Sequence, residues 1–180
     1  MLVLPSLLRP IQGWSRRRVL NMCSGVSKSN RVCIVGGGFG GLYTALKLSQ
    51  KNPSLDISLI DPKDKFVFLP LLYELAVGTA SIVEVAPRYK ELLRGTNINF
   101  IQGIVKNIVD KKVVVDQDFG DVFESKEVEF DQLVIATGAQ PRFNLFPGAA
   151  EHAMPFSKVE DAVLYSFTVR TAFHFYSSTN

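Results

Sequence analysis

The stretch that decides the fold is residues 31–61, which read RVCIVGGGFGGLYTALKLSQKNPSLDISLID. It opens with an apolar, mostly β-branched run at Val32–Val35, a pattern typical of a strand buried on both faces. This run leads directly into the glycine-rich segment Gly36–Gly41. A buried strand that runs into consecutive glycines indicates a tight turn at the edge of a sheet.

Three of these glycines match the pattern G-x-G-x-x-G, and each has its own task in a turn that binds a dinucleotide. Gly36 allows the tight turn, Gly38 lets a pyrophosphate approach the backbone, and Gly41 lets the following helix pack closely on the strand. Phe39 and Gly40 complete the turn, whose N–H groups and helix dipole would face the phosphates.

The rest of the stretch supplies the context that this motif needs. A helix is predicted from about Gly40 to Gln50, and a second strand over Ile57–Ile60 ends in Asp61. Asp61 lies 25 positions beyond Gly36, close to where such a fold places the acid that binds a ribose hydroxyl. A glycine turn without a ligand is the alternative, but the order of these elements favours a dinucleotide site. The acid favours FAD or NAD over NADP, because it suits a free 2′-hydroxyl.

Composition places the chain among ordinary globular proteins. Hydrophobic residues make up 47% of the chain and charged residues 21%, and the length fits one domain or slightly more. No apolar run approaches the ~18–20 residues of a membrane-spanning helix. The two cysteines, Cys23 and Cys33, form no C-x-x-C pair, and only two histidines are present. The sequence therefore predicts no metal site.

The net charge of +3 comes from the first thirty residues. Residues 1–30 hold five basic residues and no acid, which leaves a net charge of −2 for the rest of the chain. A mildly acidic folded part argues against a nucleic-acid partner. The leader is rich in Arg, with Leu, Ile, Val and Trp between the basic residues, as is typical of an organellar transit peptide. We therefore expect import into the mitochondrion, with the plastid or a basic tail without targeting role as alternatives.

Beyond Asp61 the pattern predicts helical segments first and strands afterwards. Leu69–Leu75 and Pro87–Leu93 have helical character, and Gly78 and Gly95 would end these helices. From Asn97 onwards the period changes to that of strands, with turns at Asn107–Lys112 and Gln117–Gly120. The predicted strands are Ile98–Ile101, Gly103–Val109, Lys112–Asp116, Glu127–Phe130 and Gln132–Ala136. This order predicts a doubly wound, Rossmann-like α/β domain with an inserted β-meander.

Four segments resemble a known family. They are VGGGFGGLYTALKL at Val35–Leu48, FVFLPLLYELAVGTASIVEVAPR at Phe66–Arg88, YKELL at Tyr89–Leu93, and FDQLVIATGAQP at Phe130–Pro141. Together with Asp61 they are similar to the two-dinucleotide flavoproteins. Within that superfamily they resemble the type II NAD(P)H:quinone oxidoreductases, and in particular their organellar and cyanobacterial subgroup.

The resemblance implies a site for FAD. The FAD pyrophosphate would lie over Gly36–Gly41 and its adenosine ribose on Asp61, while the backbone at Val105 would lie near the adenine. Ala136, Thr137 and Gly138 would lie near the flavin half. The bound flavin carries the redox chemistry in such proteins, so we nominate no catalytic side chain.

The resemblance also implies an activity and a cellular setting. A hydride would pass from NAD(P)H through the flavin to a membrane quinone. Peripheral association with the mitochondrial inner membrane is implied, and a homodimer is compatible with the family.

The family pattern is matched over residues 31–162 and then stops. Residues 163–180 are rich in Phe, Thr and Ser and lack a helical period, and we expect no NAD(P)H-binding domain in this sequence. We therefore expect residues 31–162 to form the N-terminal part of an FAD-binding domain. Two alternatives stay open: a truncated, catalytically silent nucleotide-binding module, and another flavoprotein reductase of the superfamily. A disulfide reductase would need a cysteine pair that this sequence lacks.

Overall fold

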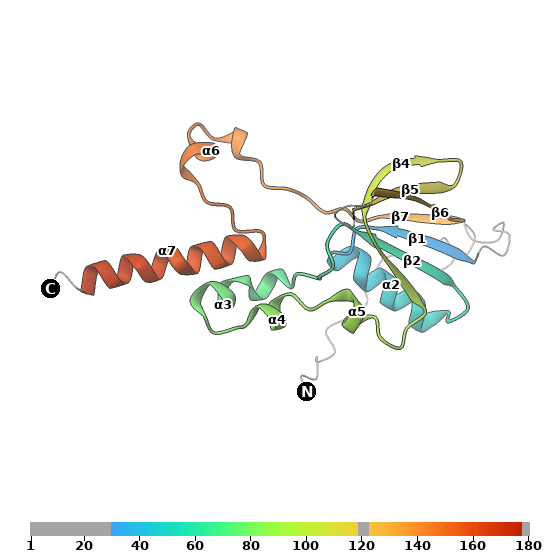
Figure 1. The fold of residues 1–180 in the computed structure, drawn as a ribbon, viewed down its shortest axis with the longest axis horizontal. Helices are drawn as coiled ribbons and strands as arrows, with labels where there is room; N and C mark the ends of the chain where they lie inside the picture. Colours follow the sequence, from blue (N-terminus) through green and yellow to red (C-terminus); the bar gives the residue numbers. More distant parts are fainter. Residues whose placement is uncertain (1–29, 119–122, 178–180) are drawn as a thin grey trace, which may run out of the picture.

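A four-stranded parallel sheet lies on one side of the protein, with a group of helices on the other (Figure 1). The computed structural model describes residues 30–118 and 123–177. The strand order is β3-β2-β1-β7, in which the chain winds outward from β1 to β3 and later returns to the other side of β1. This is the order of a Rossmann-like dinucleotide-binding fold. The strands are β1 (Arg31–Val35), β2 (Asp56–Asp61), β3 (Ile98–Gln102) and β7 (Gln132–Ile135).

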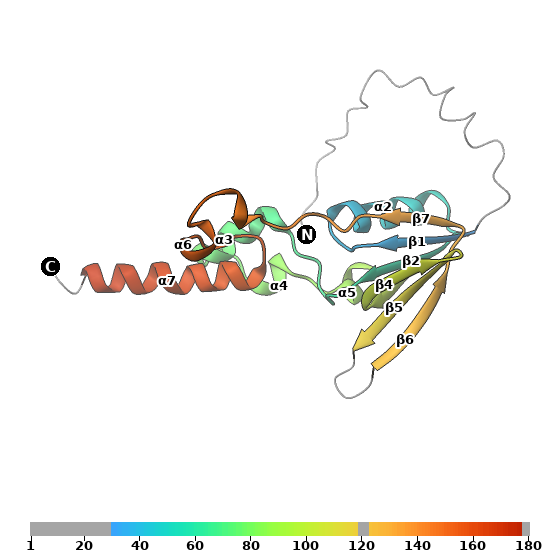
Figure 2. The same ribbon diagram turned by 90° about the horizontal axis from the view of Figure 1, so that it is seen from above.

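The two faces of the sheet are covered by different elements (Figure 2). Helix α2 (Phe39–Lys51) covers one face. The other face packs against an antiparallel meander of order β4-β5-β6. Its strands are β4 (Ile104–Val109), β5 (Lys112–Asp118) and β6 (Phe123–Glu129).

Alternation along β1 divides the core into two clusters. Val32 and Ile34 pack with α2 in the first cluster, whereas Cys33 and Val35 pack with the meander in the second. All four side chains are buried. A strand buried on both faces needs an unbroken apolar run, which explains the sequence of β1.

The register of the strands brings four chain segments to one edge of the sheet. Val35 pairs with Ile60 and with Ile135, and Ile60 pairs with Ile101. The segments that follow these four strands therefore leave the sheet side by side. They include the glycine segment after β1 and Ala136 after β7. In open parallel sheets, ligands bind at this carboxyl edge.

A helical lobe lies beside the sheet (Figure 1). Its core consists of five buried residues from α3, α4 and the start of α7: Leu72, Leu75, Ala76, Val85 and Ala162. The short elements around it are a 3₁₀ turn η1 (Leu69–Leu71), α3 (Leu72–Val77), α4 (Ile82–Val85) and α5 (Tyr89–Leu92). A second 3₁₀ turn η2 (Phe143–Leu145) and α6 (Ala149–His152) precede α7 (Val159–Ser177).

Most predicted elements are confirmed, with shifted ends. The helix predicted at Pro87 begins at Tyr89, and the strand predicted at Glu127 begins at Phe123. The predicted turn at Gln117–Gly120 is wrong at its first two positions, which belong to β5, and its other two lie outside the described residues. Helix α4 was not predicted, although Ser81 and Glu84 form a capping box that marks its start.

Helix α7 continues beyond the point where the sequence loses its helical period. Its start is held by Asp161, whose carboxylate accepts backbone N–H groups of Ser157 (2.8 Å) and Lys158 (3.0 Å). No glycine or proline occurs from Val159 to Ser177, so nothing breaks the helix once it has started. Within the part of the chain that the structure describes, no helix is long and apolar enough to cross a bilayer.

Removing core volume at the sheet should destabilise the fold. Leu59 on β2 is fully buried in the first cluster, and Leu59→Ala should lower the free energy of unfolding by about 2–5 kcal/mol. Val83→Ala is the control, since Val83 is 72% exposed and should change stability by less than about 0.5 kcal/mol. Urea unfolding followed by circular dichroism checks both, and equal midpoints would contradict the assignment of the core.

Candidate functional site

The first glycine of the motif makes the turn at the end of β1. Gly36 has a φ of +99°, a conformation that L side chains rarely adopt. Its N–H donates to the Ile60 carbonyl at 2.8 Å. A Cβ atom at Gly36 would lie 2.3 Å from the carbonyl oxygen of Ala136. The structure thus brings the glycine turn against the segment that follows β7.

The third glycine lets α2 approach this turn. A Cβ atom at Gly41 would lie 1.8 Å from the Gly36 carbonyl oxygen, a backbone atom that cannot move aside. Gly40 is different, because its nearest neighbour would be the Ala136 Cβ at an ordinary 3.6 Å. The close helix packing predicted for Gly41 is therefore present in the structure.

The second glycine faces open space. A Cβ atom at Gly38 would meet no atom within 4 Å. Gly38 is also the N-cap residue of α2, and no side chain caps this helix. The first N–H groups of a helix have no acceptor within the helix, so they are available to a ligand here. Phe39 could offer only its backbone, since its ring packs against Tyr43 and Phe66.

The acid at the end of β2 lies beside the turn. One carboxylate oxygen of Asp61 accepts the Gly37 N–H at 2.6 Å, and the other accepts the Lys63 N–H at 2.9 Å. Asp61 is half-buried. A carboxylate has about four acceptor positions, so Asp61 retains capacity for a ribose hydroxyl.

Tyr89, which the sequence analysis did not single out, binds the glycine turn from the core side. Tyr89 is 2% exposed, and its hydroxyl donates to the Gly37 carbonyl at 2.8 Å. Its ring stacks on Phe100 of β3, with centroids 4.4 Å apart. Burial, with a smaller contribution from Asp61, raises the pKa of Tyr89 well above its ordinary value. The sequence signal was a tyrosine on the inner side of a short helix, which needs a buried hydrogen-bond partner.

The remaining predicted residues fall into two groups. Ala136 continues from β7 with its N–H donating to the Val35 carbonyl at 2.8 Å, and Thr137 and Gly138 follow it as exposed residues. Val105 packs its partly buried side chain against the second core cluster, and the contact of its backbone with an adenine stays a prediction. The backbone two residues before Val105 lies at the end of β2, because the Gly103 N–H donates to the Asp61 carbonyl at 3.0 Å.

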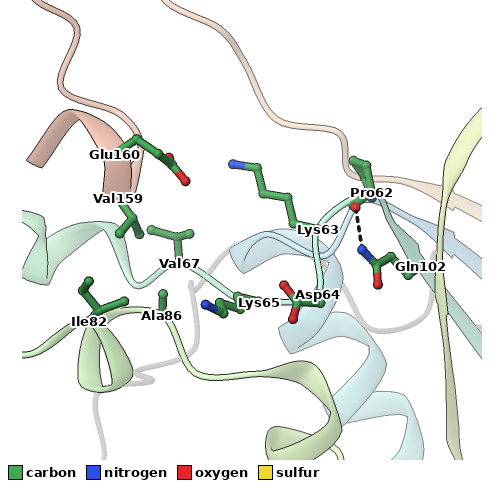
Figure 3. A pocket seen from close by; sticks show the side chains of 10 residues that line it. All are labelled: Pro62, Lys63, Asp64, Lys65, Val67, Ile82, Ala86, Gln102, Val159 and Glu160. Atoms are coloured by element: carbon green, nitrogen blue, oxygen red, sulfur yellow. Dashed lines mark hydrogen bonds between the residues drawn. The ribbon is translucent and has the colours of Figure 1, made fainter. Parts of the chain in front are cut away.

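A cavity of about 360 Å³ lies between the loop that follows β2 and the start of α7 (Figure 3). Pro62 and Lys63 form one wall, and Val159 and Glu160 of α7 form the opposite one. The Lys63 side chain reaches across in the direction of Glu160. The residues that line the cavity are Pro62, Lys63, Asp64, Lys65, Val67, Ile82, Ala86, Gln102, Val159 and Glu160.

The described residues offer no material for a metal or disulfide centre. They contain no group of three or more His, Cys, Asp and Glu side chains that could hold a metal ion. Cys33 is fully buried in β1, and burial raises the pKa of its thiol to about 11. A thiol of this kind is a core residue and a poor nucleophile.

Comparison with known proteins points to redox enzymes. Residues 30–170 match the family described as pyridine nucleotide-disulphide oxidoreductase. The chain is 38% identical over 149 residues to an alternative NAD(P)H-ubiquinone oxidoreductase C1, chloroplastic/mitochondrial, of Arabidopsis thaliana, a match that covers 76% of this chain and 29% of the relative. It is 41% identical over 139 residues to the demethylphylloquinone reductase NdbB of Synechocystis, covering 73% of this chain and 33% of the relative.

Solved structures agree on the fold. The sulfide:quinone oxidoreductase of Aquifex aeolicus superposes with a TM-score of 0.69 at 28% identity, over 81% of this chain and 32% of that one. NDH2 of Plasmodium falciparum in complex with NADH gives a TM-score of 0.64 at 26% identity, over 76% of this chain and 28% of that one. The resemblance to type II NAD(P)H:quinone oxidoreductases is confirmed. The chain spans about a third of the length of these relatives.

Adjacent glycines in α2 should respond in opposite ways to the same change. Gly41→Ala forces a methyl group onto the Gly36 backbone and should cost about 1–3 kcal/mol or more of stability. Gly40→Ala has room and should be neutral or stabilising by up to about 1 kcal/mol, because alanine favours the helix. Thermal unfolding of both variants checks this, and a Gly41→Ala variant as stable as Gly40→Ala would contradict the close approach.

The Tyr89 hydroxyl should make stability depend on alkaline pH. Because burial raises the pKa of Tyr89 in the folded state, the folded protein keeps a proton that the unfolded chain loses near pH ~10. The stability that the neutral Tyr89 contributes to the folded protein is fully present below that pH. It is lost as the pH rises toward the folded-state pKa. Tyr89→Phe should be about 0.5–1.5 kcal/mol less stable at neutral pH, and the gap should narrow above pH ~10. Urea unfolding of both proteins across this pH range checks the prediction. A difference in unfolding free energy that stays constant with pH would count against a buried neutral phenol.

Proposed function

Because the chain belongs to the pyridine nucleotide-disulphide oxidoreductase family, we propose that its glycine turn binds FAD as part of a flavin-dependent NAD(P)H:quinone oxidoreductase. The observation that carries this proposal is the open, uncapped start of α2 at Gly38. A Cβ atom at Gly36, Gly37 or Gly41 would lie within 2.3 Å of a protein atom, and one at Gly40 would lie 3.6 Å from Ala136, whereas one at Gly38 would meet no atom within 4 Å. A backbone cradle that is open at one glycine suits a pyrophosphate.

Each part of FAD would have residues near the turn to hold it. The N–H groups at the start of α2 would hold the pyrophosphate, and Asp61 would accept a hydroxyl of the adenosine ribose. The exposed Thr137 and Gly138 would lie along the flavin half, since Ala136 touches the turn at Gly36. The bound flavin supplies the redox chemistry. This chain's own residues bind and orient it, and none of them needs to act as an acid or base.

The relatives' names support NAD(P)H and a quinone as the substrates. Relatives named for NAD(P)H or NADH with a quinone come from a plant and from Mycobacterium tuberculosis. Such names favour an oxidoreductase over a catalytically silent module. A sulfide-quinone reductase of Aquifex aeolicus is also similar, at 32% identity. A disulfide reductase would need a pair of cysteines, and the described residues contain none, since Cys33 is a buried free cysteine.

We place the protein in an organelle. Relatives are named as chloroplastic/mitochondrial or mitochondrial, and one is cyanobacterial. The basic leader of residues 1–30, most of which lies outside the described residues, has a composition suited to import. We propose the mitochondrion, with peripheral attachment to its inner membrane.

Imaging of a fluorescent fusion of the full chain tests the mitochondrial location. Accumulation in plastids would overturn it in favour of the plastid.

Changes at Gly38 should separate cofactor binding from stability. Gly38→Asp places a good N-cap residue at the start of α2 and should leave the protein equally stable or slightly more stable. Its carboxylate would stand beside the pyrophosphate. Like charges ~4 Å apart repel by about 4 kcal/mol at an effective dielectric of 20, so FAD affinity should fall at least about 100-fold. FAD fluorescence titration and thermal unfolding measure the two effects.

Gly38→Ser is the matched control, because serine caps the helix without adding charge. It should bind FAD better than Gly38→Asp at similar stability.

The wild-type chain should bind FAD more tightly than FMN, which lacks the pyrophosphate and adenosine, and more tightly than NAD. Absence of FAD binding by the wild type, or equal binding by Gly38→Asp, would overturn the proposed site.

A further inference from the structure

Resting on the proposed FAD site, we propose that Tyr89 is a positioning residue for the pyrophosphate, because its hydroxyl aims the Gly37–Gly38 peptide at the ligand. Tyr89 is remote in sequence from the motif and lies below the turn, where it cannot touch the ligand itself. Its effect on binding passes through the backbone of Gly37.

The argument begins with the planarity of the peptide group. The Tyr89 hydroxyl donates to the Gly37 carbonyl at 2.8 Å, from inside the core. In a trans peptide the carbonyl and the next N–H point in opposite directions, and no peptide in the described residues is cis. The N–H of Gly38 is therefore turned away from Tyr89. It faces the side on which a Cβ of Gly38 would meet no atom.

The preceding peptide is fixed by a second contact. The Gly37 N–H donates to the Asp61 carboxylate at 2.6 Å. Tyr89 and Asp61 thus hold the peptides on both sides of Gly37. Because glycine is otherwise free in φ and ψ, a glycine-rich turn without such contacts would lose much entropy on binding a ligand. A turn that is fixed beforehand avoids that loss.

Tyr89 is itself held firmly enough to serve this purpose. Its ring stacks on Phe100 at 4.4 Å, and its N–H donates to the Asp64 carbonyl at 3.0 Å. Burial and the nearby Asp61 keep the phenol neutral, and so a hydrogen-bond donor, by raising its pKa. The fit also explains the residue at position 37, where a Cβ atom would lie 2.2 Å from the Tyr89 hydroxyl oxygen.

The test compares FAD binding by the full-length wild type and Tyr89→Phe. Phenylalanine keeps the ring and its stacking, so the variant should fold. Loss of one hydrogen bond should weaken FAD binding by about 3- to 10-fold. The two ³¹P resonances of bound FAD, recorded at saturating FAD, should also shift relative to those of the wild type, because the Gly38 N–H is no longer aimed.

Ile98→Val is the matched control. Ile98 is buried at the opposite end of β3 from the turn, and this change costs about as much stability as losing one hydrogen bond. Its FAD affinity and ³¹P resonances should equal those of the wild type. If Tyr89→Phe matches the wild type in both, or if Ile98→Val changes as Tyr89→Phe does, Tyr89 has a structural role only and the inference is wrong. Failure of the wild type to bind FAD would instead refute the proposed function.

Discussion

The structure depends on a backbone contact that leaves no room for side chains. The turn after β1, the start of α2 and the segment after β7 meet within van der Waals distance at Gly36, Gly41 and Ala136. Two of these three positions must be glycine, one because of its positive φ and both because backbone oxygens occupy the place of a Cβ atom. This contact sets how closely α2 approaches the sheet. It thereby sets where the open N-terminus of α2 lies relative to Asp61.

The parallel register makes that contact possible. Because β1, β2, β3 and β7 end at nearly the same level, residues far apart in sequence leave the sheet together. The Ile60 carbonyl accepts from Gly36, and the Asp61 carbonyl accepts from Gly103. These bonds lie just beyond the sheet and join the glycine turn, β2 and the meander. The candidate site thus begins where the sheet ends, at the carboxyl edge where ligands bind in open parallel sheets.

The two core clusters have separate tasks. The first joins α2 to the sheet and contains Tyr89, so the packing that holds the helix also holds the donor beneath Gly37. The second joins the meander to the other face and contains Cys33, whose thiol is a core group. The helical lobe has its own small core and shares a cavity with the loop after Asp61.

The sequence alone determined the strand–glycine–helix–strand–acid unit, because each of those steps is local: buried strands need apolar runs, and tight turns need glycine. The meander and the return strand follow from local patterns in the same way, whereas the family was recognised from the resemblance of whole motifs. Only the tertiary structure revealed Tyr89 under Gly37, since that hydrogen bond joins residues 52 positions apart. It also packed the partly buried Val105 side chain against the second core cluster and continued α7 to Ser177. Contacts between distant segments decide such features, and no local pattern of residues records them.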